Sequence, residues 1–151
     1  MSHAVLCPAD MFSHDELIRY AQSAESAGFD TIWLPELFGR DPFVTCASVL
    51  AATTYIRVGT AIANVYARDA RATKAAAFSL ADAHKNRFEL GLGLSNKVGN
   101  TPRGHDWLPP LSKMQDFMDR YDGADMMFKH EASVPVYLAA HGPKLMDFAA
   151  D

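Results

Sequence analysis

Glu36 is the only carboxylate in the sequence that directly follows a predicted strand, the run Thr31–Leu34 that ends at a proline. A carboxylate in this place could anchor the ring of a cofactor or take part in proton transfer. It could equally form a salt bridge with Arg40 or Arg68, or cap the start of a helix. The residue types leave both interpretations open.

Two further polar or glycine-rich runs, Thr60–Asn64 and Gly91–Ser95, also follow predicted strands. Asn64 could hydrogen-bond the edge of a flavin-like ring, or it could occupy an unusual turn that asparagine tolerates. Gly91 and Gly93 would let a flat ligand approach the backbone closely. Glycines at the end of a strand are also common packing devices, so neither run identifies a ligand by itself.

Histidine and tryptophan side chains are the candidates for substrate contact. His105 and Trp107 lie in a predicted loop over residues 95–110, where they could cover a bound molecule. A tryptophan in such a loop can also serve only as a packing anchor. His141 ends the last predicted strand and could act as a general acid or contact a cofactor.

The composition predicts a single folded domain. The chain has 151 residues, of which 49% are hydrophobic and 21% charged, and this is enough to build a core. A net charge of -4 without a basic stretch argues against nucleic acid as a partner. No apolar run approaches the roughly 20 residues that span a bilayer. Scattered histidines predict no metal site, and two cysteines without a CxxC motif or a leader segment predict a cytoplasmic protein with reduced, buried thiols.

Strand-like and helical patterns alternate along the chain. Strands are predicted at residues 4–7, 31–34, 56–60, 87–93 and 134–140. Helices are predicted over residues 13–27, 41–53, 72–83 and 111–127, and from residue 143 onward. Ser13 and Glu16 form a capping box, Asp41 is followed by a proline suited to a first helical turn, and Gly28 suits a helix end.

This alternation implies parallel strands with right-handed crossovers, either in a closed (β/α)8 barrel or in an open doubly wound sheet. A dinucleotide-binding open sheet carries its glycine fingerprint after the first strand, but residues 8–12 contain no glycine. This favours the barrel. A barrel needs about 250 residues, so we predict an α/β fold of the (β/α)8 TIM-barrel type that is incomplete. It has about five βα units and forms one domain, residues 1–151, truncated after the fifth strand.

The ordered segments resemble the luciferase-like monooxygenase family of flavin- or F420-dependent oxidoreductases. They run in the family's order across nearly the whole chain, at residues 24–36, 56–60, 87–93, 135–140 and 142–144. Residues 64–68 and 104–107 are most similar to the F420-dependent branch. One position departs from the pattern of bacterial luciferases, which carry a catalytic histidine where this chain has Leu37.

The resemblance implies that F420 or FMN binds at the carboxyl ends of the strands, where barrel enzymes place their sites. It implies hydride transfer with F420, or monooxygenation with reduced FMN, on a small organic substrate. It also implies that Thr60–Asn64 forms a bulge behind the cofactor ring. The predicted site comprises Glu36 as catalytic residue, Thr60, Ala61, Ile62, Asn64, Gly91, Gly93 and Ser95 at the cofactor, His105, Trp107 and His141 at the substrate, and no metal.

Three hypotheses follow. The first is an oxidoreductase of this family, either a piece of a longer chain or a short form that covers its open sheet edges as a homo-oligomer. The second is a catalytically inactive partial barrel, a remnant or an interaction module. The third is an unrelated α/β binding protein. Cofactor binding separates the first from the other two.

Overall fold

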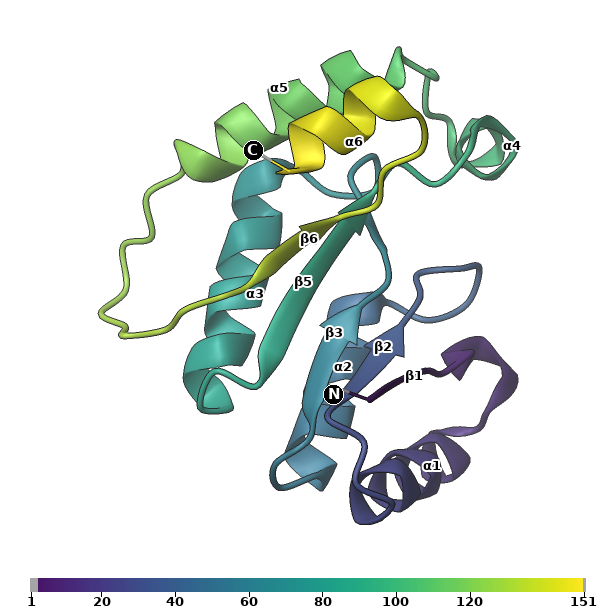
Figure 1. Ribbon diagram of the computed structural model, residues 1–151, viewed down its shortest axis with the longest axis vertical. Coiled ribbons are helices and arrows are strands. Elements are labelled where there is room, and N and C mark those ends of the chain that lie inside the picture. Colours follow the sequence, from purple (N-terminus) through teal and green to yellow (C-terminus); the bar gives the residue numbers. More distant parts are fainter. Residues whose placement is uncertain (1–2, 151) are drawn as a thin grey trace.

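The computed structural model describes residues 3–150 and contains a parallel sheet with helices (Figure 1). The strands are β1 (Ala4–Leu6), β2 (Thr31–Leu34), β3 (Arg57–Thr60), β4 (Ala63–Asn64), β5 (Phe88–Gly93) and β6 (Val136–Leu138). The α-helices are α1 (His14–Ser26), α2 (Pro42–Ala52), α3 (Ala70–Ala83), α4 (Lys97–Asn100), α5 (Pro110–Asp122) and α6 (Pro143–Ala150).

Neighbouring strands of the sheet follow one another in the chain. β1 pairs with β2, β2 with β3, β3 with β5 and β5 with β6, all in parallel, while the short β4 continues β3 along β5. A doubly wound sheet reverses its strand order at a switch point, whereas a barrel adds each strand beside the previous one. The order therefore confirms the predicted incomplete barrel.

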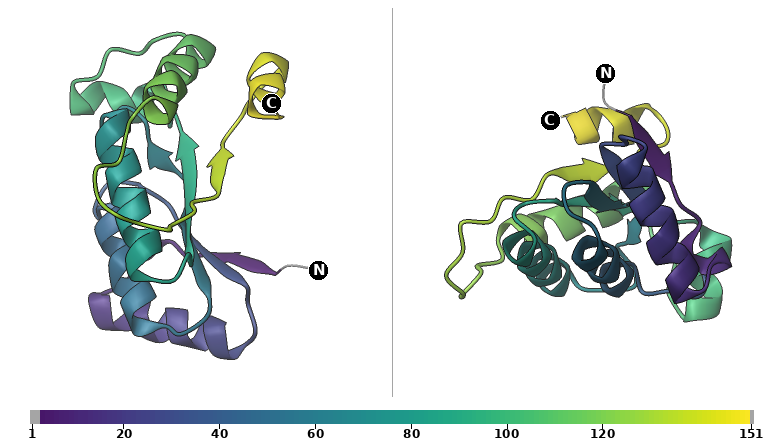
Figure 2. Two further views of the ribbon diagram at one scale, coloured as in Figure 1. Left: turned by 90° about the vertical axis from the view of Figure 1, so that its left-hand side faces the viewer. Right: turned by 90° about the horizontal axis from the view of Figure 1, so that it is seen from below.

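The main core lies between the sheet and helices α1, α2 and α3, which cover the same side of it (Figure 2). Strand residues on this side are fully or almost fully buried, namely Ile32, Leu34, Val58, Phe88, Leu90 and Leu92. They meet helix residues that include Leu17, Val49, Leu50 and Ala77. Burying each large aliphatic or aromatic side chain contributes about 1.5–3 kcal/mol, so this layer holds the strand ends in place.

The other side of the sheet, which we call the inner face, carries the aromatic rings of Trp33 and Tyr137. Trp33 lies across Gly59, where an added Cβ would come within 2.4 Å of the indole. Tyr137 meets the same indole edge to face, with ring centroids 5.4 Å apart. Tyr137 keeps 49% of its surface exposed, so the inner face is accessible to a ligand.

Most local predictions are confirmed. Ser13 and Glu16 form the predicted capping box, and Asp41 caps α2 through the backbone N–H groups of Phe43 and Val44. Gly28 has the left-handed φ of +83° expected after a helix. Both cysteines are buried.

Several bounds differ from prediction. The predicted fifth strand, residues 134–140, is shorter in the structure, where β6 covers only Val136–Leu138. Helix α3 begins two residues early, because Asp69 caps it by accepting from the N–H of Ala72. The predicted end of the fourth helix near residue 127 is wrong: α5 ends at Asp122 before Gly123, a poor helix former. The predicted loop 95–110 contains the short helix α4 and a 3-10 turn, Thr101–Arg103.

Candidate functional site at the carboxyl ends of the strands

A β-bulge between β3 and β4 forms the centre of the site. Gly59 pairs with Glu89, and Ala63 pairs with Leu92. The chain thus advances four residues on one strand (59 to 63) and three on the other (89 to 92), which is one extra residue. The extra length falls at Ala61 and Ile62, which are joined by a cis peptide bond.

The side chain of Thr60 replaces the missing ladder bonds at the bulge. Its hydroxyl donates to the carbonyl of Gly91 at 2.7 Å and accepts from the N–H of the same residue at 3.0 Å. The hydroxyl is therefore fully used within the protein. Thr60 is fully buried. Its side chain therefore supports the bulge from within the sheet.

Gly91 and Gly93 make room for the bulge itself. A Cβ on Gly91 would lie 1.9 Å from the carbonyl oxygen of Thr60, and one on Gly93 would lie 2.6 Å from Cγ1 of Ile62. The space next to both glycines is already occupied by protein atoms. Of the two interpretations open from the sequence, the packing role thus has direct geometric support.

Two apolar hollows flank Ile62 at the carboxyl ends of the strands. The first, the inner cleft, has a volume of about 320 Å³. It is lined by Leu6, Trp33, Thr60, Ala61, Ile62, Gly91, Tyr137, Leu138 and Ala139. The second, the side pocket, has a volume of about 280 Å³. It is lined by Ile62, Gly93, Leu94, Ser95, Trp107, Pro110, Ala139, His141 and Leu145. Ile62 and Ala139 belong to both, so the two hollows adjoin.

Glu36 is nearly buried beside the bulge, with 7% of its side chain exposed. One carboxylate oxygen accepts from the backbone N–H of Asn64 at 2.9 Å and pairs with Arg68 at 3.4 Å. The other pairs with Arg103 at 3.1 Å. Arg68 also pairs with Asp41. Of the two salt bridges that the sequence left open for Glu36, the one with Arg68 is present, whereas the sequence did not single out Arg103.

Asn64 is buried, and both ends of its amide group are bonded within the protein. Its oxygen accepts from the N–H of Tyr66 at 3.0 Å, and its nitrogen donates to the side chain of Asn100 at 2.8 Å. Asn100 is fully buried and was not singled out from the sequence, because a distant pairing of two amides leaves no local pattern.

Tyr66 holds the loop that carries His105 and Trp107, two of the three predicted substrate residues. Its ring stacks on Trp107 with centroids 5.7 Å apart, and His105 contacts it at 5.8 Å. Its hydroxyl accepts from the N–H of Leu108 at 3.0 Å. Trp107 thus both anchors the loop and lines the side pocket, together with His141, whereas His105 rests on Tyr66.

A third hollow, the outer pocket, lies beside Glu36 with a volume of about 590 Å³. Its lining includes Glu36, Phe38, Asn64, Ser95, Val98 and Arg103. Ser95 lies between the outer and side pockets and has a positive φ of 57°. The strand ends therefore gather Glu36, the bulge, Ser95, Trp107 and His141 around adjoining hollows.

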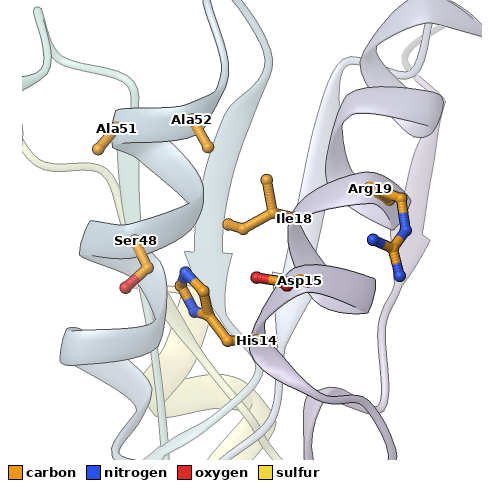
Figure 3. Close-up of a pocket in the computed structure, with 7 residues that line it drawn as sticks. All are labelled: His14, Asp15, Ile18, Arg19, Ser48, Ala51 and Ala52. Atoms are coloured by element: carbon orange, nitrogen blue, oxygen red, sulfur yellow. The ribbon is translucent and has the colours of Figure 1, made fainter.

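A groove on the helix side of the sheet is separate from these hollows (Figure 3). It runs between α1 and α2 and has a volume of about 570 Å³. Its lining residues are His14, Asp15, Ile18, Arg19, Ser48, Ala51 and Ala52. Figure 3 shows the imidazole of His14 directed toward Ser48 of α2. None of the predicted site residues lines this groove, so it is not part of the candidate site.

Within residues 3–150, no group of three or more His, Cys, Asp or Glu side chains is placed to hold a metal ion. No helix in the described part of the chain is both long enough and apolar enough to cross a membrane.

The chain is similar to known redox enzymes. A family model described as luciferase-like monooxygenase matches residues 1–151. A 5,10-methylenetetrahydromethanopterin reductase of Methanolobus tindarius is 30% identical over 155 residues, which cover 90% of this chain and 47% of the relative. A putative coenzyme F420-dependent oxidoreductase of Mycobacterium tuberculosis is 32% identical over 108 residues, which cover 71% of this chain and 30% of that protein.

The fold is also that of a solved F420-dependent secondary alcohol dehydrogenase in complex with an F420-acetone adduct. The TM-score is 0.83 at 16% identity, over 99% of this chain and 56% of the dehydrogenase. The matched part of the chain thus spans about half the length of the Methanolobus tindarius reductase and of the alcohol dehydrogenase. It spans less than half of the mycobacterial relative.

Proposed function

The chain belongs to the luciferase-like monooxygenase family, and from this premise we propose that residues 1–151 form one oxidoreductase domain that binds F420 or FMN and acts on a small organic molecule. The observation that carries the proposal is the bulge at Ala61–Ile62, which borders two adjoining apolar hollows at the carboxyl ends of the strands. Barrel enzymes place their active sites at these ends.

The inner cleft suits one face of a flat aromatic ring. Ala61, Ile62 and the rings of Trp33 and Tyr137 provide an apolar wall, and ligand pockets are lined mainly by such side chains. Gly91 supports this wall by leaving space for the Thr60 carbonyl, which a Cβ at this position would meet. The bound cofactor supplies the redox chemistry, hydride transfer for F420 or oxygen insertion for reduced FMN.

The remaining site residues orient and enclose the ligands. Glu36, fixed by two arginines, presents a negatively charged acceptor beside the bulge. Trp107 and His141 line the side pocket next to Ile62, where they would contact the substrate and exclude water. His105 supports the same loop through Tyr66. Asn64 and Ser95 border the outer pocket, where polar groups of a cofactor could be bound.

The F420-dependent branch has additional support, since a relative that is 32% identical is named as a putative F420-dependent oxidoreductase. FMN remains the second cofactor to test, because the matched family is described as monooxygenases.

The test is a fluorescence titration of the purified chain with F420 and with FMN, and its mass in solution is measured on the same sample. We expect saturable binding in the micromolar range or tighter, and the mass reports whether the binding species is a homo-oligomer. Ile62→Ala should weaken binding about tenfold, the scale expected if the ligand covers about two of the three carbon atoms that the substitution removes. The matched change Ile18→Ala, in the groove between α1 and α2, should leave binding unaltered.

A folded chain that binds neither cofactor would refute this proposal. That result would favour the alternative of a catalytically inactive partial barrel. Equal losses of affinity in Ile62→Ala and Ile18→Ala would place the ligand elsewhere than at the bulge.

A further inference from the structure

We propose that Asn100 is a positioning residue, which holds the bulge in its cofactor-binding geometry through the side chain of Asn64. This inference rests on the proposed function in one respect, namely that the bulge supports a cofactor. The two asparagines are 36 residues apart in the chain, and both are buried. Neither side-chain amide is exposed enough for water to be its main hydrogen-bond partner.

The two amides form a short relay of hydrogen bonds with fixed polarity. At one end, the backbone N–H of Tyr66 can only donate, and it donates to the oxygen of Asn64. At the other end, the carbonyl of Leu94 can only accept, and it accepts from the nitrogen of Asn100 at 2.8 Å. The remaining nitrogen of Asn64 and oxygen of Asn100 meet at 2.8 Å. Because both ends are fixed, each position requires a side chain with one donor and one acceptor in this order.

The relay connects two parts of the site that the backbone leaves far apart. Asn64 ends β4, directly after the bulge, and its own N–H bonds to Glu36. Asn100 ends α4, in the segment that follows β5 and leads to Trp107. Through the relay, this segment fixes the end of the bulged strand, and the bulge in turn directs Ile62 between the inner cleft and the side pocket.

Removing Asn100 would leave buried groups without partners. The nitrogen of Asn64 and the carbonyl of Leu94 would each lose a hydrogen bond, which is costlier in the interior than at the surface. The Asn64 amide would then be free to rotate away from Tyr66, which loosens the end of β4. The effect on Ile62 and on Glu36 follows from this loosening and requires no contact between Asn100 and the cofactor.

The experiment compares Asn100→Ala with Thr101→Ala as a matched control. Thr101 is adjacent, and its hydroxyl donates to the carbonyl of Lys97 within α4, without reaching the bulge. Hydrogen exchange is measured on both variants without cofactor. We expect the amide protons of Asn64, Val65 and Tyr66 to exchange about tenfold faster in Asn100→Ala only, the scale of one buried hydrogen bond. Asn100→Ser, too short to reach both partners, replaces Asn100→Ala if that variant does not fold.

Cofactor titration then tests the positioning role itself. We expect Asn100→Ala to raise the Kd of the cofactor about tenfold, and the double variant with Asn64→Ala to bind no more weakly than the weaker single variant, because both substitutions break one relay. Unchanged amide exchange in Asn100→Ala, or equally faster exchange in Thr101→Ala, would contradict the claim that the relay holds the end of β4. Faster exchange in Asn100→Ala with an unchanged Kd would contradict the claim that Asn100 positions the bulge for the cofactor. If the unaltered chain binds no cofactor, the proposed function fails. The exchange data, which are measured without cofactor, still test whether Asn100 holds the end of β4.

Discussion

Gly91→Ala tests whether the bulge depends on the absence of a side chain at this position. The new Cβ would be 1.9 Å from the carbonyl oxygen of Thr60, so the oxygen would have to retreat by about 1.6 Å to reach an ordinary separation of about 3.5 Å. Thr60 cannot move freely, because its hydroxyl is bonded to both backbone groups of Gly91.

The expected loss of stability follows from these contacts. Overpacking costs about 1–3 kcal/mol, and each weakened hydrogen bond of Thr60 adds about 1 kcal/mol. The reduced entropy of the unfolded chain returns about 0.4–1 kcal/mol. We expect Gly91→Ala to lower the free energy of unfolding by about 3 kcal/mol and the Tm by about 6–12 °C.

Gly123→Ala is the matched control for the same chemical change. Gly123 has a φ of -71° and its added Cβ would meet only the Asp119 carbonyl at 3.2 Å. Urea denaturation followed by circular dichroism gives the free energy of unfolding of both variants. If Gly91→Ala were within about 1 kcal/mol of Gly123→Ala, well short of an overpacking cost, the argument that glycine is required to admit the bulge would be wrong.

Three further predictions use other contacts of the chain. Burial alone would raise the pKa of Glu25, but the backbone N–H groups of residues 54–56 bind its carboxylate and lower the pKa below the usual value. A depressed pKa stabilises the fold above the unfolded pKa, and this stability is lost as the pH falls through the folded pKa. Glu25→Gln should therefore cost more stability at pH 7 than at about pH 3, and an equal cost in urea denaturation at both would contradict this. Tyr66→Leu should shift the fluorescence emission of Trp107 to longer wavelength in a Trp33→Phe background, because the indole loses its stacked partner; an unchanged spectrum would mean that other contacts hold the loop. Arg103→Met should lower the free energy of unfolding by about 1–3 kcal/mol, because it removes an ion pair with the nearly buried Glu36 and a hydrogen bond to the Leu37 carbonyl, while Arg68 still partners the carboxylate. No measurable loss in urea denaturation would contradict this.

Signals between neighbouring residues were readable from the sequence. The capping box of Ser13 and Glu16, the cap at Asp41 and the left-handed Gly28 each involve positions within a few residues. Their physical cause is the need to satisfy free backbone groups at helix ends, which a local pattern reveals. The alternation of strands and helices, with no glycine directly after the first predicted strand, likewise favoured a barrel.

The roles of individual site residues depended on distant contacts. Glu36 was located at a strand end by sequence, but its bond to Arg103 joins residues 67 positions apart. Gly91 could equally have faced a ligand or served in packing, and the Thr60 carbonyl beside it supports the packing role. Asn100 carried no local signal at all.

The sequence by itself thus determined the main strands and helices, their parallel arrangement and the family, because these depend on short-range periodicity and on the order of segments. Only the tertiary structure decided which side chains meet at the bulge. An extra residue in one strand shifts every later pairing, and the partners of a buried amide or carboxylate come from whichever segment the fold brings beside it.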